Sequence, residues 1–97
     1  MTDLVTRSTL PTDLHTILTA AAGTRANQLA ALPFDDADLV ARAHRASVAR
    51  ILHEIHSALD RLDAGTYGDC AECSRTIPIE RLERLLWTSH CTRCASR

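Results

Sequence analysis

The chain has 97 residues, of which 45% are hydrophobic and 24% charged, and its formal net charge is −1. This length leaves room for one small domain, and so small a core usually needs a metal, disulfides or a partner. No apolar run approaches the roughly 18 residues of a membrane span, and the N-terminus lacks the apolar stretch of a signal peptide. We therefore expect a cytoplasmic protein that does not bind membranes and whose thiols stay reduced.

Charge is unevenly distributed along the chain. The first 38 residues carry five Asp against two Arg, and the remaining residues carry nine Arg against seven acids. Most of these arginines are expected to be solvated, because acids are interspersed among them. A nucleic-acid-binding protein would need a clustered basic stripe, so we expect no direct sequence-specific binding to DNA.

The first predicted element is a helix that follows a flexible tail at residues 1–8. Its start is marked by Pro11 in a first-turn position, with Asp13 favourable near the positive helix end. One face of this helix carries a stripe with 4-3-4-3 spacing that is apolar except for one arginine. The stripe consists of Leu14, Leu18, Ala22, Arg25, Leu29 and Leu32. Pro33 disfavours helical geometry at Leu32, so the helix is expected to end there.

A second helix is predicted to begin just after this break. Asp35 is its expected N-cap, and Asp36 and Asp38 fall in its first turn, where acids complement the helix dipole. Its apolar positions again fit a heptad spacing. They are Val48, Ile51, Leu52, Ile55, Leu59 and Leu62. The helix should end near Ala64, because Gly65 can adopt the left-handed conformation that stops helices.

Two long helices joined by a few residues are expected to fold back on each other as an antiparallel hairpin. We predict that this hairpin is a coiled coil over residues 9–64, with an acidic tip at residues 33–38. A turn centred near residues 34–35 would make the numbers of facing residues sum to about 69–70. The predicted fold class is therefore all-α, with the acidic tip far from the C-terminal cysteines.

Four cysteines form two matched C-x-x-C pairs near the end of the chain, Cys70/Cys73 and Cys91/Cys94. The separation of the pairs lies in the range of about 15–20 residues that is typical of structural zinc sites. One tight C-x-x-C turn aims two thiolates at a point, and a second turn completes a tetrahedron. We predict a zinc-finger module at residues 65–97 in which these cysteines bind one structural Zn²⁺, with no open position for catalysis.

Other metal-site interpretations are less well supported. A redox C-x-x-C and incidental thiols are possible alternatives, but four cysteines in this pattern favour zinc, and the usual ferredoxin spacings are absent. His90 could replace one thiolate, although it lies outside both C-x-x-C turns. His53 and His56 are one helical turn apart, with His15 nearby in the inferred register, but they do not have the H-E-x-x-H spacing of metalloproteases.

Three runs in the C-terminal part carry a resemblance to a known family. They are G-T-Y-G-x-C-x-x-C from Gly65 to Cys73, I-P-x-x-R-L from Ile77 to Leu82, and the closing C-x-x-C. With these runs, residues 58–94 resemble the DksA/TraR family of zinc-finger transcription regulators. Because the sequence stops soon after its last cysteine pair, the C-terminal helix of better-known members is expected to be missing, and alarmone contacts made through it are not carried over.

The resemblance implies a binding function rather than catalysis. Family members bind bacterial RNA polymerase, insert the coiled-coil tip through the secondary channel and change the lifetime of promoter complexes. The family tip motif reads approximately D-x-x-D-x-A, and Asp35, Asp38 and Val40 occupy those places here, with valine replacing alanine. Acids at a helix N-terminus also have a structural explanation, since one caps free amides, but three acids exceed that need.

Two alternatives belong to other functional classes. A nucleic-acid-binding zinc module would show steep salt dependence from its phosphate contacts. A structural adaptor would act through homo-oligomerisation of its hairpin, with Val40 and the layer of Arg25 and His44 shaping the interface. No nucleophile with its base and no phosphate-cradling glycine loop is present, so we expect the protein not to be an enzyme.

Overall fold

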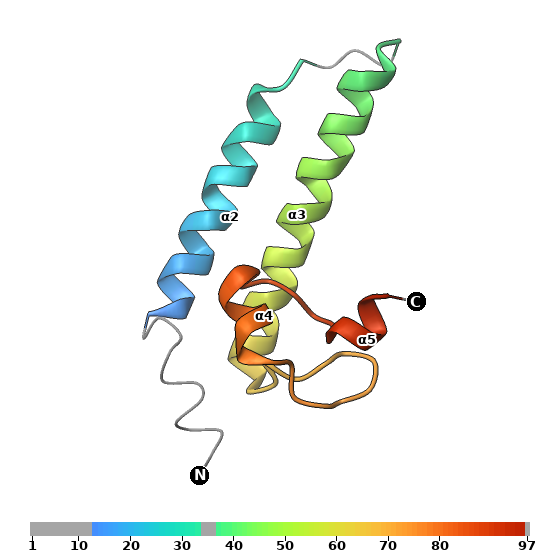
Figure 1. Ribbon diagram of the computed structural model, residues 1–97. Helices are drawn as coiled ribbons and strands as arrows, with labels where there is room; N and C mark the ends of the chain where they lie inside the picture. The colour runs from blue at the N-terminus through green and yellow to red at the C-terminus, as the bar shows by residue number, and fades with distance from the viewer. Residues whose placement is uncertain (1–12, 34–36, 97) are drawn as a thin grey trace.

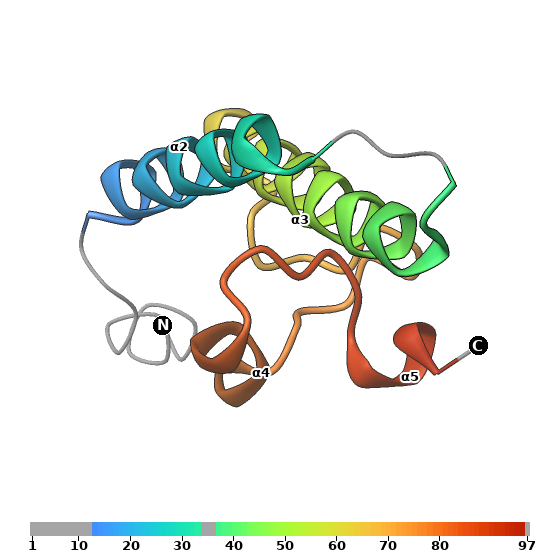
Figure 2. The same cartoon turned by 90° about the horizontal axis from the view of Figure 1, so that it is seen from above.

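The computed structural model describes residues 13–33 and 37–96, and these residues are mostly helical. The helices in chain order are α2 (Leu14–Ala31), α3 (Leu39–Ala64), α4 (Ile79–Arg84) and α5 (Thr92–Ala95). α2 and α3 lie side by side and antiparallel as a rod, and the segment after α3 folds back against one end of that rod (Figures 1 and 2). The predicted all-α hairpin with a C-terminal four-cysteine unit is confirmed.

Two further points concern the described ranges only. They contain no strand, although an isolated antiparallel bridge joins Asp69 to Thr76. They also contain no helix with the length and apolar content to cross a bilayer. The predicted tail at residues 1–8, the expected Pro11 start and the predicted cap Asp35 lie outside the described residues.

The ends of the rod helices follow from their terminal residues. α2 stops before Leu32, whose ψ of 139° is extended, as the following proline requires. α3 stops at Ala64, and Gly65 follows in the left-handed conformation with φ of 78°. The amide of Gly65 donates to the Leu62 carbonyl and that of Thr66 to the Arg61 carbonyl, the two bonds of a Schellman motif. Both predicted helix ends are therefore confirmed.

The start of α3 differs from the sequence prediction. Asp38, rather than Asp35, is the N-cap, and its Oδ1 accepts hydrogen bonds from the Val40 amide at 3.0 Å and the Ala41 amide at 3.2 Å. A cap must directly precede the first helical residue, which is Leu39, so Asp38 lies at the cap position and not in the first turn. The prediction of Asp35 as the cap was wrong because it began the helix three residues too early.

This cap gives a testable difference between two aspartates. Asp38→Ala is expected to lower the free energy of unfolding by about 1 kcal/mol, because two amides of α3 lose their acceptor. For a chain of this size that corresponds to a fall of about 4–8 °C in Tm. Asp13→Ala is the matched control, because Asp13 precedes α2 without a side-chain cap bond, and its effect should stay within about 0.5 kcal/mol. Thermal unfolding of the zinc-loaded variants measures the change in Tm for each. Equal changes in Tm for the two variants would contradict the assignment of Asp38 as the N-cap of α3.

Polar contacts at both ends of the rod define the register of its helices. Arg45 donates hydrogen bonds to the carbonyl oxygens of Leu32 at 2.8 Å and Pro33 at 2.6 Å. At the other end, His15 Nε2 lies 4.0 Å from Asp63 Oδ1. The residue numbers of these pairs sum to 77 or 78, so the predicted register was wrong. The reason is that α3 begins beyond the end of α2 along the rod, so the two helices are not paired symmetrically about residues 34–35 (Figure 1).

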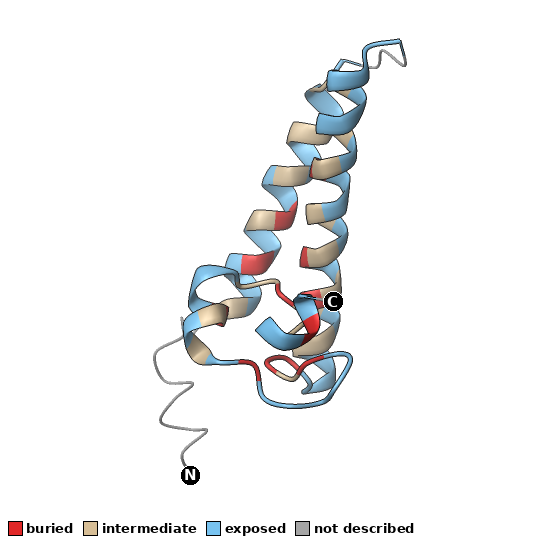
Figure 3. Cartoon of the chain, turned by 45° about the vertical axis from the view of Figure 1, so that its right-hand side comes forward, coloured by how far each residue is buried: buried red, intermediate tan, exposed pale blue. Residues whose placement is uncertain are grey.

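One buried cluster joins the rod to the C-terminal module. Leu18 of α2 and Ile55 of α3 are fully buried, as are Ile77 and Leu82 of the module. Tyr67 and three of the four cysteines belong to the same cluster, and the lone tryptophan packs against it. Figure 3 shows that most buried residues gather at the end of the rod that meets the module. The rod and the module therefore share one core rather than having one each.

Candidate metal centre

The first cysteine pair lies in a small backbone hairpin directly after α3. The Cys70 amide donates to the Arg75 carbonyl at 2.8 Å, and the Ile77 amide donates to the Gly68 carbonyl at 2.8 Å. The turn between them closes when the Ser74 amide donates to the Cys70 carbonyl at 2.9 Å. Ser74 has a positive φ of 64°, which allows the chain to reverse immediately after the C-x-x-C turn. These bonds hold both thiols of the pair on one side of the hairpin.

The second pair lies at the start of α5. Cys91 directly precedes this helix and Cys94 is within it, so one helical turn brings the two sulfurs to the same side. The Ala95 amide donates to the Cys91 carbonyl at 2.9 Å and fixes that turn. The Ala71 amide of the first pair donates to the Ser89 carbonyl at 2.7 Å, which brings the two C-x-x-C turns together.

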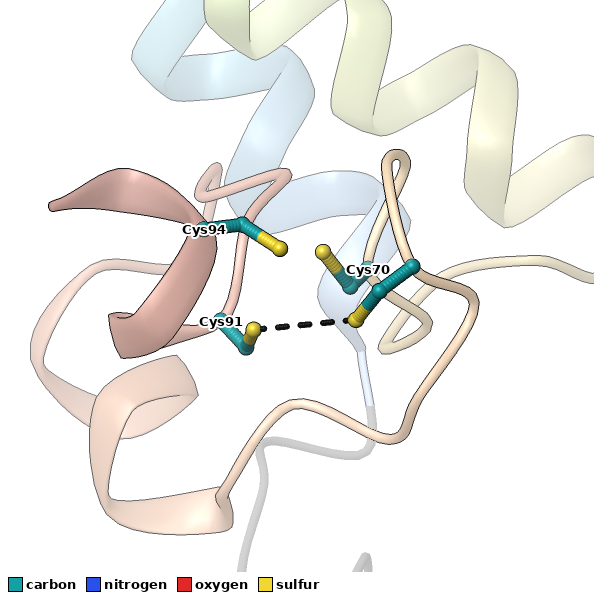
Figure 4. Close-up of side chains that lie close together, drawn as sticks. Cys70, Cys91 and Cys94 are labelled. Atoms are coloured by element: carbon teal, nitrogen blue, oxygen red, sulfur yellow. Dashed lines mark hydrogen bonds between the residues drawn. The ribbon is translucent and has the colours of Figure 1, made fainter. Parts of the chain in front are cut away.

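The four sulfurs converge on one point. All four Sγ atoms lie within 4.8 Å of one another, and Cys73 Sγ and Cys91 Sγ are 3.8 Å apart (Figure 4). A tetrahedral zinc site with Zn–S bonds of about 2.3 Å has S···S edges of about 3.8 Å. Cys70, Cys91 and Cys94 are buried and Cys73 is exposed. The four cysteines are thus positioned to bind one metal ion, and their soft thiolates suit zinc.

The surroundings of the thiols divide them into two kinds. Backbone N–H groups, chiefly that of Cys73 and then that of Cys91, stabilise the Cys70 thiolate and lower the pKa of this thiol to about 6. The Cys94 amide likewise lowers the pKa of the Cys91 thiol. Burial, together with the neighbouring thiols, raises the pKa of Cys94 to about 12. A metal ion therefore meets at least one thiolate already formed and one thiol whose proton it must displace.

These pKa directions set the pH dependence of zinc binding. Near neutral pH the Cys70 thiol is largely ionised, whereas Cys94 keeps its proton until metal displaces it. The zinc affinity is thus expected to fall by at least about tenfold when the pH is lowered from 8 to 7. The fall should be steeper below pH 6, where Cys70 also becomes protonated. Competition titrations against a chelator of known affinity measure this slope. An affinity independent of pH would contradict the thiolate assignment.

No histidine joins this centre. Ser89 Oγ and His90 Nδ1 are 2.8 Å apart, so the His90 ring is engaged next to the cysteines rather than with them. His53 and His56 are exposed on α3, and His15 faces Asp63. Within the described part of the chain, the four cysteines are the one group of three or more such side chains placed to hold a metal ion.

The start of α3, which carries Asp38 and Val40 of the predicted tip, lies at the opposite end of the rod from the cysteines (Figure 1). Asp35 lies outside the described residues, whereas Asp38 and Val40 mark the start of α3. Val40 is 79% exposed and the adjacent Leu39 is 73% exposed. A shallow hollow of about 260 Å³ opens beside them. Its lining residues are Leu32, Pro33, Asp38, Val40, Ala41 and His44.

Two side chains that hold the backbone between α4 and the second cysteine pair were not foreseen from the sequence. Arg61 of α3, which was expected on a solvated face, donates to carbonyl oxygens of Trp87 and Thr88. Tyr67 donates its hydroxyl hydrogen to the Leu86 carbonyl at 2.8 Å. Tyr67 lies within the G-T-Y-G run, which offered a signal for its role. No pattern in the sequence distinguished Arg61 from the other arginines.

A closed set of four thiolates near the end of a helical rod defines a structural zinc finger. Residues 65–97 match the family model described as "Prokaryotic dksA/traR C4-type zinc finger", and about the last third of the chain is therefore a zinc finger of the DksA/TraR type. This confirms the resemblance and the prediction of one zinc ion as cofactor.

The chain is also similar to an uncharacterized protein of Aquifex aeolicus (strain VF5). The two are 46% identical over 44 residues, which cover 45% of this chain and 30% of the relative. The match thus spans less than a third of the relative's length. No solved structure matches the chain.

Proposed function

We propose that this protein is a regulator of transcription that binds bacterial RNA polymerase and inserts the tip of its helical rod into the secondary channel. In this proposal Cys70, Cys73, Cys91 and Cys94 bind one structural zinc, and Asp35, Asp38 and Val40 form the active tip. The observation that carries it is the combination of a DksA/TraR-type finger with a two-helix rod whose far end presents exposed acidic and apolar side chains.

The dimensions of the rod support an insertion mechanism. The 26 residues of α3 correspond to a length of about 39 Å at 1.5 Å per residue. The finger lies at one end of this length and Asp38 at the other (Figure 1). A partner that binds the finger could therefore be contacted by the tip at a point well away from the site where the finger binds.

The chemistry of the tip supports a role beyond capping. Both cap bonds of Asp38 end on Oδ1, so the cap does not use Oδ2, and the side chain is exposed. Leu39 and Val40 expose most of their apolar surface beside it. Exposed apolar side chains next to an acid are typical of a contact surface for another protein.

Asparagine substitutions separate capping from a polymerase contact. Asn is as good an N-cap as Asp but carries no charge, so Asp35→Asn/Asp38→Asn should preserve the fold. Wild-type and variant proteins, both zinc-loaded, are first tested for retention by immobilised core RNA polymerase. The lifetime of promoter complexes is then measured with each. We expect both proteins to be retained and only the wild type to change the lifetime.

Other results would redirect the proposal. If the variant changed the lifetime as strongly as the wild type, the acids would not act at the tip. If neither protein bound polymerase, the proposal would fail. Sedimentation of the free protein would then test the adaptor alternative, which requires a stable homo-oligomer, and a salt titration of DNA binding would test the nucleic-acid alternative.

A further inference from the structure

The segment between α4 and the second cysteine pair is held by an unusual series of backbone contacts. We call residues 86–90 the strap. Each of its five consecutive carbonyl oxygens accepts a hydrogen bond from a residue outside the strap. In chain order the donors from outside the strap are Tyr67 Oη, Arg61 for two carbonyls in succession, the Ala71 amide and Arg81 Nε, and Thr88 Oγ1 of the strap itself also donates to the last carbonyl.

These donors come from every part that surrounds the strap. Arg61 belongs to the last turns of α3, Tyr67 to the loop after it, Ala71 to the first C-x-x-C turn and Arg81 to α4. The strap is therefore the place where the rod, the first cysteine pair and α4 meet. It leads directly into Cys91, so its far end is fixed when the cysteines close on a metal ion.

Arg61 occupies the centre of this arrangement. Its guanidinium donates to the Trp87 carbonyl at 3.3 Å and the Thr88 carbonyl at 3.2 Å, while its Nε is buried without a hydrogen-bond partner. Its own carbonyl accepts from the amides of Thr66 and Tyr67, which close the end of α3. Burial lowers the pKa of Arg61. Burial of a positive charge costs free energy, and the hydrogen bonds of Arg61 offset this cost only while its carbonyl partners stay in place.

We infer that the strap is a zinc-dependent latch that fixes the finger to the base of the rod, with Arg61 as the side chain that closes it. When the four cysteines close, Cys91 is held beside the first pair and the Ser89 carbonyl meets the Ala71 amide. The strap carbonyls are then aligned for Arg61 and Tyr67. When the metal leaves, the strap loses this alignment, Arg61 loses its acceptors, and the junction between rod and finger opens together with the rest of the fold.

The coupling must act in both directions. If metal binding favours the closed latch, then an intact latch favours metal binding by the same factor. Couplings of this kind are typically about 5-fold to 150-fold in affinity. The latch does not depend on any partner, so it stands or falls independently of the proposed binding to RNA polymerase.

The test is a substitution that cuts the latch without touching the cysteines. Arg61→Met keeps an unbranched side chain as far as the position of Nε and removes the guanidinium donors. Arg50→Met, on an exposed position of the same helix, controls for the loss of one positive charge. The zinc affinity of each is measured by chelator competition, and the absorption spectrum of the cobalt-substituted protein reports whether four thiolates still bind tetrahedrally. We expect Arg61→Met to bind zinc on the order of tenfold more weakly, with an unchanged cobalt spectrum, and Arg50→Met to bind within about twofold of wild type.

Hydrogen exchange of the zinc-saturated proteins distinguishes a latch from general stabilisation. In Arg61→Met the amides of Thr66, Tyr67 and Thr88 should exchange faster, while that of Ile77 in the finger stays protected. Ile55→Ala, which weakens the shared core, should instead accelerate exchange throughout. Arg61→Lys should restore part of the zinc affinity, because it can still donate to one carbonyl.

If Arg61→Met does not fold, Tyr67→Phe provides the second variant, because it removes only the hydroxyl that bonds the Leu86 carbonyl. It should weaken zinc binding several-fold and expose the Thr88 amide to exchange. The inference is overturned if the folded variant binds zinc as tightly as wild type, or if exchange rises uniformly rather than at the junction.

Discussion

Removal of zinc is expected to unfold the whole chain rather than to leave a bare helical rod. Structural zinc contributes about 10–16 kcal/mol of apparent binding energy in zinc-finger peptides, which is comparable to or greater than the entire stability of a typical domain, about 5–15 kcal/mol. Here three of the cysteines are part of the same buried cluster as Leu18 and Ile55 of the rod. Unfolding of the finger would therefore expose much of the apolar surface that the two rod helices bury.

The residues buried on the rod itself are few. They are Leu18, Ala22, Val48, Ile55 and Ala58. Such a two-helix core is too small to fold alone. The helical circular dichroism signal, followed while a strong chelator removes the metal, should thus be lost in one cooperative step.

Re-addition of zinc is the control for this experiment, and it should restore the helical signal. Cys91→Ser should behave like the chelated protein even with zinc present, because serine supplies no thiolate. A metal-free protein that kept both its helical signal and a cooperative thermal transition would show that zinc does not hold the fold.

The second large effect is expected at the centre of the shared core. Ile55 is fully buried where α3 meets both α2 and the finger. Ile55→Ala removes three buried carbon atoms and leaves a cavity, so it should lower the free energy of unfolding by about 2–5 kcal/mol. Urea denaturation at one fixed zinc concentration measures this loss, because free zinc itself shifts the apparent stability.

Ile17→Ala is the matched control, since it makes the same chemical change on the other rod helix. Ile17 is 38% exposed, so its truncation should cost less than about 1.5 kcal/mol. Equal losses at the two positions would contradict the burial of Ile55 at the junction of the rod and the finger.

The features that sequence predicted well are those with a local physical cause. The C-x-x-C pairs predicted the metal site, because each turn aims its own two thiols and the soft-ligand chemistry then selects zinc. Pro33 and Gly65 predicted the helix ends, because Pro33 disfavours helical geometry at the residue before it and Gly65 offers a left-handed conformation at its own position. The apolar stripes predicted the rod, because the spacing of apolar residues within one segment shows which face of a helix is buried.

The features that sequence did not predict depend on distant contacts. The register was wrong because it was extrapolated from an assumed turn, whereas Arg45 bonds carbonyls just after the end of α2 and His15 lies beside Asp63 near the end of α3. The N-cap was placed at Asp35 because three acids competed for one role and only the first helical residue decides among them. Arg61 was taken as solvated because its acceptors are backbone carbonyls, which every residue has and no pattern distinguishes.

The central claim is that one zinc ion bound by four thiolates holds the finger against the rod. X-ray absorption at the zinc edge, recorded on the purified protein with its metal content determined, tests this claim most directly. One zinc per chain, with four sulfur neighbours at about 2.3 Å and no nitrogen or oxygen neighbour, is the predicted result. A first shell with three or fewer sulfurs, or with a histidine nitrogen such as that of His90, would contradict it.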